Sequence, residues 1–280
     1  MSGTGMPSAA KLLRLPAQGR LLVATDLRGN VRDFMQIVAR FERLSTDGYL
    51  LLLGDLIHGP YLTESEWDPR LGRYYRDESP GLLMKLSLLQ ERYPGRVHAL
   101  LGNHEHAHVG GPHTARFAAD EVQVLEQRLG AEVAEWLRQW LAGWPLWAIA
   151  PCGILFSHGA PGQAPAQLEE LEDLDYRRWQ PLGQTESQDP RARLLGKLLW
   201  TRSLSPPEAR RVLHVAGCHL MVYGREVVEG YEVIGQEQLI LASSFGLPDD
   251  KKRILELDLG ARYESVAALR EGHEILPLYR

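Results

Sequence analysis

Five short segments of the sequence carry side chains of the kinds that bind divalent cations. These candidate ligands are Asp26, Asp55, Asn103 with His104, His158 and His219. Carboxylate and amide oxygens and neutral imidazoles suit Mg²⁺, Mn²⁺, Fe and Zn²⁺. A carboxylate that bridges two cations about 3.5–4 Å apart lets them clamp a phosphoryl group and ionise a water. The residue types therefore predict a metal site that hydrolyses phosphate esters, with Asp55 as the bridge.

Each candidate also has an ordinary structural explanation. Aspartates such as Asp26 and Asp55 are common in turns and at helix N-caps. A single histidine is more often a hydrogen-bonded, partly buried residue than a ligand. The recurrence of such residues after apolar runs favours a metal site over these explanations. Cys218, beside His219, is an alternative ligand at that point. The group His104, His106, His108 and His113 is either a separate metal site or, as we prefer, a polar loop.

The elements that must position these residues follow from the apolar pattern. Strands are predicted at 21–24, 50–53, 97–101, 154–156, 212–216, 239–242 and 254–259, and helical spacing at 31–41 and 114–143. Continuous apolar strands joined by helices are typical of a parallel sheet that is covered on both faces. Ligands of such sheets bind at the carboxyl ends of the strands, which is where Asp26, Asp55 and Asn103 stand.

The predicted fold is α/β, with two mixed sheets face to face and helices outside. We expect a flexible lead-in at 1–18 and a single domain at 19–280. The polar segment 162–193 is expected to be a solvated helix and loop. Four tryptophans near helical spacing are interpreted as packing residues, although they also suggest a platform for stacking bases. They are Trp136, Trp140, Trp144 and Trp147.

Composition limits the classes of partner. The chain has 280 residues, of which 31 are basic and 36 acidic, giving a formal charge of −5. This balance argues against general nucleic-acid binding and against attraction to anionic membranes. No apolar run approaches the roughly 18 residues of a membrane-spanning helix. Two cysteines are too few for a disulfide framework, which predicts a reducing, cytoplasmic location.

The ordered motifs resemble those of the calcineurin-like metallophosphoesterases. The carrying segments are TDLRGN, GD, GNHE, SHG and a late histidine, and LLWTR at 198–202 is similar to a segment of the phosphoprotein phosphatase branch. Bacterial and phage serine/threonine phosphatases and diadenosine tetraphosphatases share the pattern. The resemblance implies a metal-dependent phosphatase that acts on a phosphorylated protein or nucleotide. It makes Asp26 a ligand of the first metal and Asp55 the bridge. Asn103, His158 and His219 complete the second metal site. It also implies that His104 is the general acid and that Arg202 grips the phosphate.

The sequence departs from the family at its first motif, where Asp-x-His is replaced by Asp26-Leu27-Arg28. Arginine has no lone pair to give, so Arg28 cannot ligate a metal. We therefore expect one strong and one weak metal site, with Mn²⁺ preferred over Fe, Zn²⁺ or Mg²⁺. At the second motif Ile57-His58-Gly59 stands where the family has Asp-Arg-Gly, so the aspartate that would orient His104 and the arginine that would bind phosphate are both missing. His58 either partly replaces one of them or supplies the lost imidazole to the first metal. Arg28 is either a lost ligand or a phosphate-binding charge. The alternative function is a degenerate phosphatase that binds phosphorylated ligands without turnover.

Overall fold

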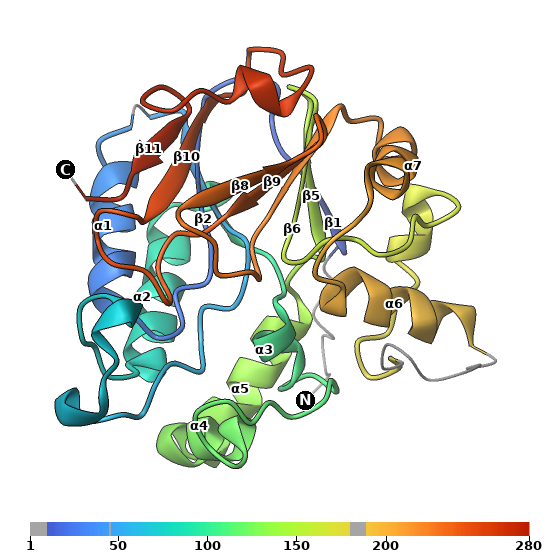
Figure 1. Cartoon of the computed structure of the whole chain (residues 1–280). Helices are drawn as coiled ribbons and strands as arrows, with labels where there is room; N and C mark the ends of the chain where they lie inside the picture. Colours follow the sequence, from blue (N-terminus) through green and yellow to red (C-terminus); the bar gives the residue numbers. More distant parts are fainter. Residues whose placement is uncertain (1–9, 45, 180–188, 280) are drawn as a thin grey trace.

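The computed structural model of the chain describes residues 10–279, except residue 45 and residues 180–188. Two mixed sheets form the centre (Figure 1). The first sheet has the order β11-β10-β2-β3-β4 and the second β1-β5-β6-β7-β9-β8. The strands of the first are β2 (Arg20–Ala24), β3 (Gly48–Leu52), β4 (Val97–Ala99), β10 (Arg253–Asp258) and β11 (Ile275–Pro277). Those of the second are β1 (Leu12–Arg14), β5 (Trp147–Ala150), β6 (Ile154–Ser157), β7 (Leu220–Tyr223), β8 (Tyr231–Ile234) and β9 (Gln238–Leu241).

The core is divided by the two faces of each strand. Leu21 and Val23 of β2 point to a core that also contains Phe156 and Val222 of the second sheet, so this core lies between the sheets. The alternate residues of β2 join a second cluster with residues of the helices. This alternation is the pattern that a strand buried on both faces produces. The predicted α/β fold, with two mixed sheets face to face and helices outside, is confirmed.

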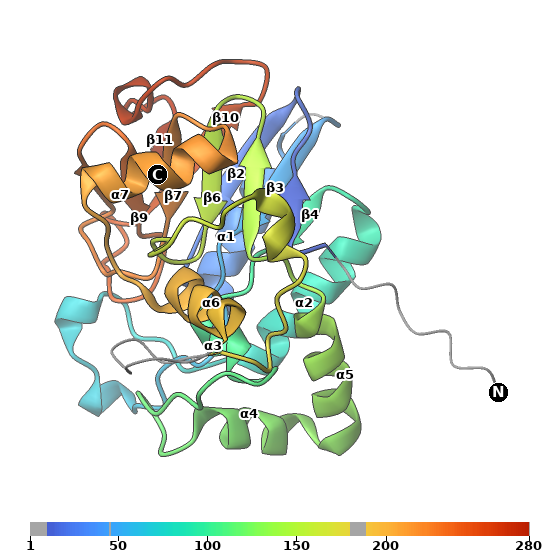
Figure 2. The same cartoon turned by 90° about the vertical axis from the view of Figure 1, so that its right-hand side faces the viewer.

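Helices cover the outer faces of both sheets. The helices α1 (Val31–Phe41) and α2 (Ser79–Arg92) lie outside the first sheet, and α6 (Pro190–Trp200) and α7 (Pro206–Ala216) outside the second (Figure 1). At one end of the sheets lie α3 (Asn103–His106), α4 (Glu121–Leu129) and α5 (Ala131–Ala142), as Figure 2 shows from the side. Gly130, with φ +78°, separates α4 from α5, so the predicted helical stretch 114–143 is two helices.

Strands β2, β3 and β4 are parallel to one another, and β6, β7 and β9 form a second parallel set. Parallel strands bring their carboxyl ends to one edge of a sheet. The segments after β2, β3, β4, β6 and β7 therefore form one rim, defined here by residues 25–30, 54–59, 102–108, 158–160 and 224–226. This rim positions the candidate functional residues.

Three details differ from the sequence predictions, and one prediction falls partly outside the described residues. Residues 12–14 form β1, which pairs with β5, so the expected flexible lead-in at 1–18 does not extend over this segment. The predicted strand at 212–216 is the end of α7, whose start is fixed by a capping box between Ser205 and Glu208. Part of the predicted polar segment, at 180–188, lies outside the described residues. Of the tryptophans, Trp144 and Trp147 are buried, but Trp136 is 42% exposed and stacks on Trp140.

Candidate active site

The rim is built from turns that bond to each other through the backbone. The amide of Arg28 donates to the carbonyl of Asp55, at 3.0 Å, and the amide of Gly29 donates to the carbonyl of Leu56, at 2.7 Å. Gly54, with φ +96°, approaches so closely that an added Cβ would lie 2.7 Å from the Gly102 nitrogen. The glycines that precede Asp55 and Asn103 thus allow the two turns to pack together.

Backbone strain is concentrated at this rim. In the described part of the chain, the residues other than glycine with positive φ are Asp26, Arg28, Asp55, His58 and Arg225. All five belong to the rim. The left-handed region costs an ordinary residue about 1 kcal/mol or more, so such residues persist only where the surroundings fix them. This strain indicates that the backbone at these five residues serves to place their side chains, at a cost in stability.

Glu105 holds the rim together from within. Its buried carboxylate accepts hydrogen bonds from the amides of Asp55 and Leu56, both at 2.8 Å, and from the amide of Gly102, at 3.1 Å. The GNHE segment contains this glutamate, but sequence reasoning gave it no role. The signal available in the sequence was an acidic residue directly after Asn103 and His104. Glu105 is a positioning residue for the turns that carry Asp55 and Asn103.

Three lone-pair atoms converge on one point of the rim. His158 Nδ1 lies 3.0 Å from the carbonyl of Leu53, which only accepts, so Nδ1 carries the proton and Nε2 is a lone pair. This Nε2 lies 3.0 Å from Asn103 Oδ1 and 3.4 Å from Asp55 Oδ1. Burial lowers the pKa of His158, which keeps the ring neutral. Acceptors that face one another with no proton between them fit one divalent cation.

The residues around Asp55 do not fit a second cation beside the first. Arg28 is only 5% exposed, and its Nη2 donates to Asp55 Oδ2 at 2.5 Å while its Nη1 donates to His104 Nε2. Burial alone would raise the pKa of Asp55, but the Arg28 guanidinium and neighbouring histidines hold that pKa well below its usual range. Burial and then the charge of Asp55 raise the pKa of Asp26. A guanidinium therefore stands beside the carboxylate that would bridge two metals.

A second arginine, Arg225, follows β7 at the same rim. Its amide donates to Asp26 Oδ2 at 2.9 Å, and its Nη1 donates to Asn103 Oδ1. Sequence reasoning missed this residue. The signal was the apolar run Leu220–Tyr223, which is a strand and ends in Gly224-Arg225.

His219, in contrast, precedes β7. Its amide donates to the carbonyl of Gly153 before β6, and its ring lies 3.5 Å from Glu264. The structure thus places His219 at the opposite end of the strands from His158, so the prediction of His219 as a ligand beside His158 was wrong. Cys218 is buried at the same end as His219 and does not replace it.

A row of histidines leads away from Arg28. His104 Nδ1 lies 3.0 Å from His58 Nδ1, His58 Nε2 lies 2.9 Å from His108 Nε2, and His108 Nδ1 lies 3.0 Å from Glu126 Oε1. Arg28 only donates and Glu126 accepts, so each neutral ring donates to its neighbour on the Glu126 side. Burial is the first cause that lowers the pKa of all three rings, which keeps them neutral.

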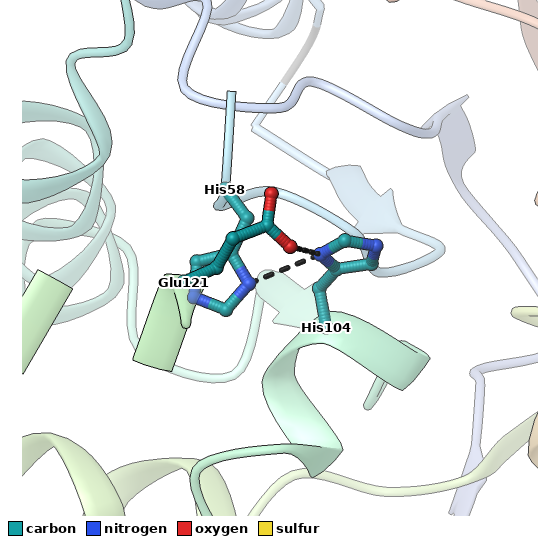
Figure 3. Close-up of side chains that lie close together, drawn as sticks. All are labelled: His58, His104 and Glu121. Carbon is teal, nitrogen blue, oxygen red and sulfur yellow. Dashed lines mark hydrogen bonds and ion pairs between the residues drawn. The ribbon is translucent and has the colours of Figure 1, made fainter. Parts of the chain in front are cut away.

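The first two members of this row form a further group of possible ligands. His58, His104 and Glu121 each present a ligand atom within 4.8 Å of the others (Figure 3). Glu121 Oε2 lies 3.7 Å from His104 Nδ1 and has no hydrogen-bond partner in the described part of the chain. By distance this group can hold a cation, although the histidine row already gives both rings partners. The separate site considered for four histidines does not form, since His106 bonds to Tyr176 and His113 to Asp120.

Comparisons with known proteins show which family the chain resembles in sequence and which solved structures share its fold. The model of the calcineurin-like phosphoesterase family matches residues 19–246. The search of curated proteins gives no significant match. A solved serine/threonine phosphatase from Saccharomyces cerevisiae, with similarity to human PP5, has 15% identity and a TM-score of 0.59, covering 90% of this chain and 77% of its own.

Two further solved structures are similar. A cold-active protein-tyrosine phosphatase of a psychrophilic Shewanella has 15% identity and a TM-score of 0.60, over 91% of this chain and 78% of that one. A putative diadenosine tetraphosphatase has 15% identity and a TM-score of 0.44, over 88% of this chain and 92% of that one. At these identities the likeness of the first two structures concerns the fold, and it agrees with the two sheets described above. No helix in the described ranges combines the length and apolarity that crossing a membrane requires.

Proposed function

Because the chain belongs to the calcineurin-like phosphoesterase family, we propose that it hydrolyses phosphate monoesters with one divalent cation at Asp55, Asn103 and His158. Family membership supports a metal-dependent hydrolase, and the resemblance inferred from the motifs is confirmed. The observation that carries the proposal is that His158 Nε2 faces Asn103 Oδ1 at 3.0 Å and Asp55 Oδ1 at 3.4 Å. Arg225 Nη1 also donates to Asn103 Oδ1 and has to leave this oxygen when the cation binds. When bound there, a divalent cation supplies Lewis acidity and lowers the pKa of a coordinated water.

The remaining residues have proposed roles of their own. Arg202, which follows α6, lines the same cavity as Asn103 and His104, and it is proposed to bind the phosphate. Arg28 is proposed to supply a fixed positive charge beside Asp55. Asp26 accepts from Thr25 and from Arg225 and is proposed to complete the cation's surroundings. Mn²⁺ is the proposed cation, since a carboxylate, an amide and one imidazole suit it.

His104 is proposed as the general acid that protonates the leaving oxygen. This role needs a proton on Nε2, the atom that accepts from Arg28 in the present arrangement. Arg28 therefore has to release Nε2, and the ring proton has to move from Nδ1 to Nε2, before His104 can donate. His58 is proposed to orient the His104 ring through the bond at 3.0 Å, in place of the missing aspartate.

The substrate is proposed to be a phosphorylated protein or a phosphorylated nucleotide, in a cytoplasmic setting. The two free cysteines, Cys152 and Cys218, are compatible with a reducing compartment. A second function is favoured by one observation: the guanidinium of Arg28 stands where the family's chemistry would need a cation. A protein with that arrangement is also suited to bind phosphorylated ligands without turnover.

The test is a metal titration of hydrolysis. The protein is stripped with a chelator, reloaded with Mn²⁺, and assayed with a chromogenic aryl phosphate and an alkyl phosphate. We expect about one tightly held cation per chain and activity that depends on it. His158→Gln should lose both the cation and the activity, while His98→Gln, outside the rim on β4, should lose neither. Full metal content without hydrolysis of either ester would reject catalysis and leave the binding function.

A further inference from the structure

Four arginines meet in one cavity beside the cation site. Arg28, Arg116, Arg202 and Arg225 line a cavity of about 310 Å³, together with Asn103 and His104. They come from four distant parts of the sequence, two of them directly after β2 and β7. Of the described residues that line this cavity, none is acidic. The fold therefore gathers positive charge at the point where a substrate would meet the rim.

The protein neutralises only half of this charge by ion pairs. Arg28 pairs with Asp55 at 2.5 Å, and Arg202 pairs with Glu226 at 2.7 Å. Across the ranges 10–44, 46–179 and 189–279, neither Arg116 nor Arg225 makes an ion pair. Arg116 instead lies over the rings of Phe245 and Phe117, with 4.7 and 5.4 Å from its Cζ to the ring centroids. Two guanidiniums thus remain without a carboxylate.

The two arginines that belong to the rim, Arg28 and Arg225, are also incompletely hydrogen-bonded. A guanidinium has five N–H donors. The Nε–H groups of Arg28 and Arg225 are buried and have no acceptor in the described part of the protein. Buried donors without acceptors are uncommon and costly in a folded protein. The unpaired charges and the unused donors both point to an anion that is bound at this place.

The charge count identifies the class of anion. A phosphate monoester carries about −1.5 to −2 charges near neutral pH. This matches the two unpaired guanidiniums, whereas a diester or a sulfate ester carries only one negative charge. Guanidinium forks also match the geometry of phosphate oxygens. A second divalent cation would add charge to a site that already has an excess, next to Arg28.

We infer that the four-arginine cavity binds the dianionic phosphate group of a monoester without any metal ion, with Arg28 and Arg225 in place of metal-ligand contacts. The inference deepens the proposed function and rests on it for the nature of the ligand as a phosphate ester. It separates two tasks that a two-metal site performs together. The arginines bind the phosphate, and the cation at Asp55, Asn103 and His158 serves only the chemistry.

The experiment measures binding of phenyl phosphate to the full chain by calorimetry at pH 7.5, in the presence of a chelator and again with Mn²⁺. Phenyl sulfate is the matched probe with one negative charge fewer. We expect the same dissociation constant for phenyl phosphate within about threefold with and without metal, and binding at least tenfold weaker for phenyl sulfate. Binding that requires Mn²⁺, or equal binding of the two probes, would overturn the inference.

Variants locate the binding site. Arg116→Gln and Arg225→Gln should each weaken phenyl phosphate about tenfold or more, the usual size for a charged hydrogen bond. Arg116→Lys should recover part of the loss, because the charge returns without the fork. The control is Arg210→Gln, since Arg210 is an exposed arginine on α7 that pairs with Glu237. Thermal unfolding of every variant checks that it folds. If both glutamine variants fold and bind as well as the control, the cavity is not the site.

Binding and hydrolysis are measured separately, so the two proposals can fail independently. If the stripped protein binds phenyl phosphate and no cation restores hydrolysis, the proposed hydrolase function fails while this inference stands. If Mn²⁺ supports hydrolysis but phenyl phosphate binds only with Mn²⁺, the hydrolase function stands and this inference fails.

Discussion

Replacement of Arg28 by methionine removes the charge that stands beside Asp55 while keeping much of the side-chain volume. The two side chains are 6% and 0% exposed, so the ion pair is buried. Removing one partner of a buried pair typically costs about 3–5 kcal/mol, because the other charge is left without compensation. We expect Arg28→Met to lower the free energy of unfolding by this amount.

The cost should fall if Asp55 is neutralised as well. Asn at position 55 keeps the acceptor for the His104 amide, which lies 3.0 Å from Oδ1. We expect the double variant Arg28→Met/Asp55→Asn to be more stable than the sum of the single variants by about 2 kcal/mol. Urea unfolding of the four proteins gives this coupling energy. Arg210→Met should cost less than about 1 kcal/mol, as for other exposed pairs.

The same variant should gain a response to metal. Without Arg28, the carboxylates of Asp26 and Asp55 face each other's charge and attract a second cation. At a free Mn²⁺ concentration of 100 times the dissociation constant, binding adds about 2.7 kcal/mol of stability. We expect Mn²⁺ to stabilise Arg28→Met by about this much more than the original protein. An equal effect of Mn²⁺ on both proteins would show that Arg28 does not exclude a second cation, and the interpretation of the rim would be wrong.

Three further predictions follow from the rim and its surroundings. Glu105→Gln should lower the free energy of unfolding in urea by about 3 kcal/mol, because an amide N–H₂ then faces backbone donors. The control is Glu91→Gln on the surface of α2, which should leave this free energy almost unchanged. A loss below about 1 kcal/mol for Glu105→Gln would contradict the role of Glu105. Burial lowers the pKa of His106 to about 4 from an unfolded value near 6.5, so its contribution to stability is complete above pH 6.5 and is lost as pH falls towards 4, by up to about 3 kcal/mol. The difference in unfolding free energy between the original protein and His106→Gln should shrink over that range, and a difference independent of pH would argue against it. Arg225→His should tighten Mn²⁺ binding at least tenfold in calorimetry, because an imidazole joins Asn103 and a cation is removed; unchanged affinity would place Arg225 outside the reach of the metal.

The sequence was sufficient for the fold because the strands that build the rim are nearly uninterrupted apolar runs. Leu21, Leu51 and Phe156 are fully buried, and their order along the chain predicts parallel strands with ligands at one edge. The choice of Asp55, Asn103 and His158 as candidate ligands followed from the same rule, and the structure brings these three side chains together.

The late histidine shows where sequence reasoning failed. The run at 212–216 is apolar and precedes a histidine, so its pattern predicts a strand with a ligand after it. The residues before it determine the outcome: Ser205, Pro206 and Glu208 start a helix, and Gly217, with φ +65°, ends it. The rim position is then shifted by one element, to Arg225.

Charge placement inside the rim could not be predicted from sequence for a different reason. Arg28 is separated from Asp55 by 27 residues and from His104 by 76, and its contacts depend on the left-handed backbone at position 28. The sequence showed that Arg28 is no ligand. Its position between a carboxylate and an imidazole is a property of the folded turn.

The row of histidines connects the buried rim, by hydrogen bonds, to the partly exposed carboxylate of Glu126. Each neutral ring has one N–H and two hydrogen-bonded neighbours, so it donates to one neighbour and accepts from the other. The tautomer of one ring therefore sets the tautomer of the next. If His104 acts as the proposed acid, a proton passed along the row from His108 through His58 reaches its Nδ1, and this keeps the ring neutral as Nε2 gives its proton to the leaving oxygen. The last proton in that exchange comes from the Glu126 end, where the carboxylate is 23% exposed and also pairs with Arg138. A residue of α4 that lies outside the cavity is then part of the path by which the proposed acid stays neutral.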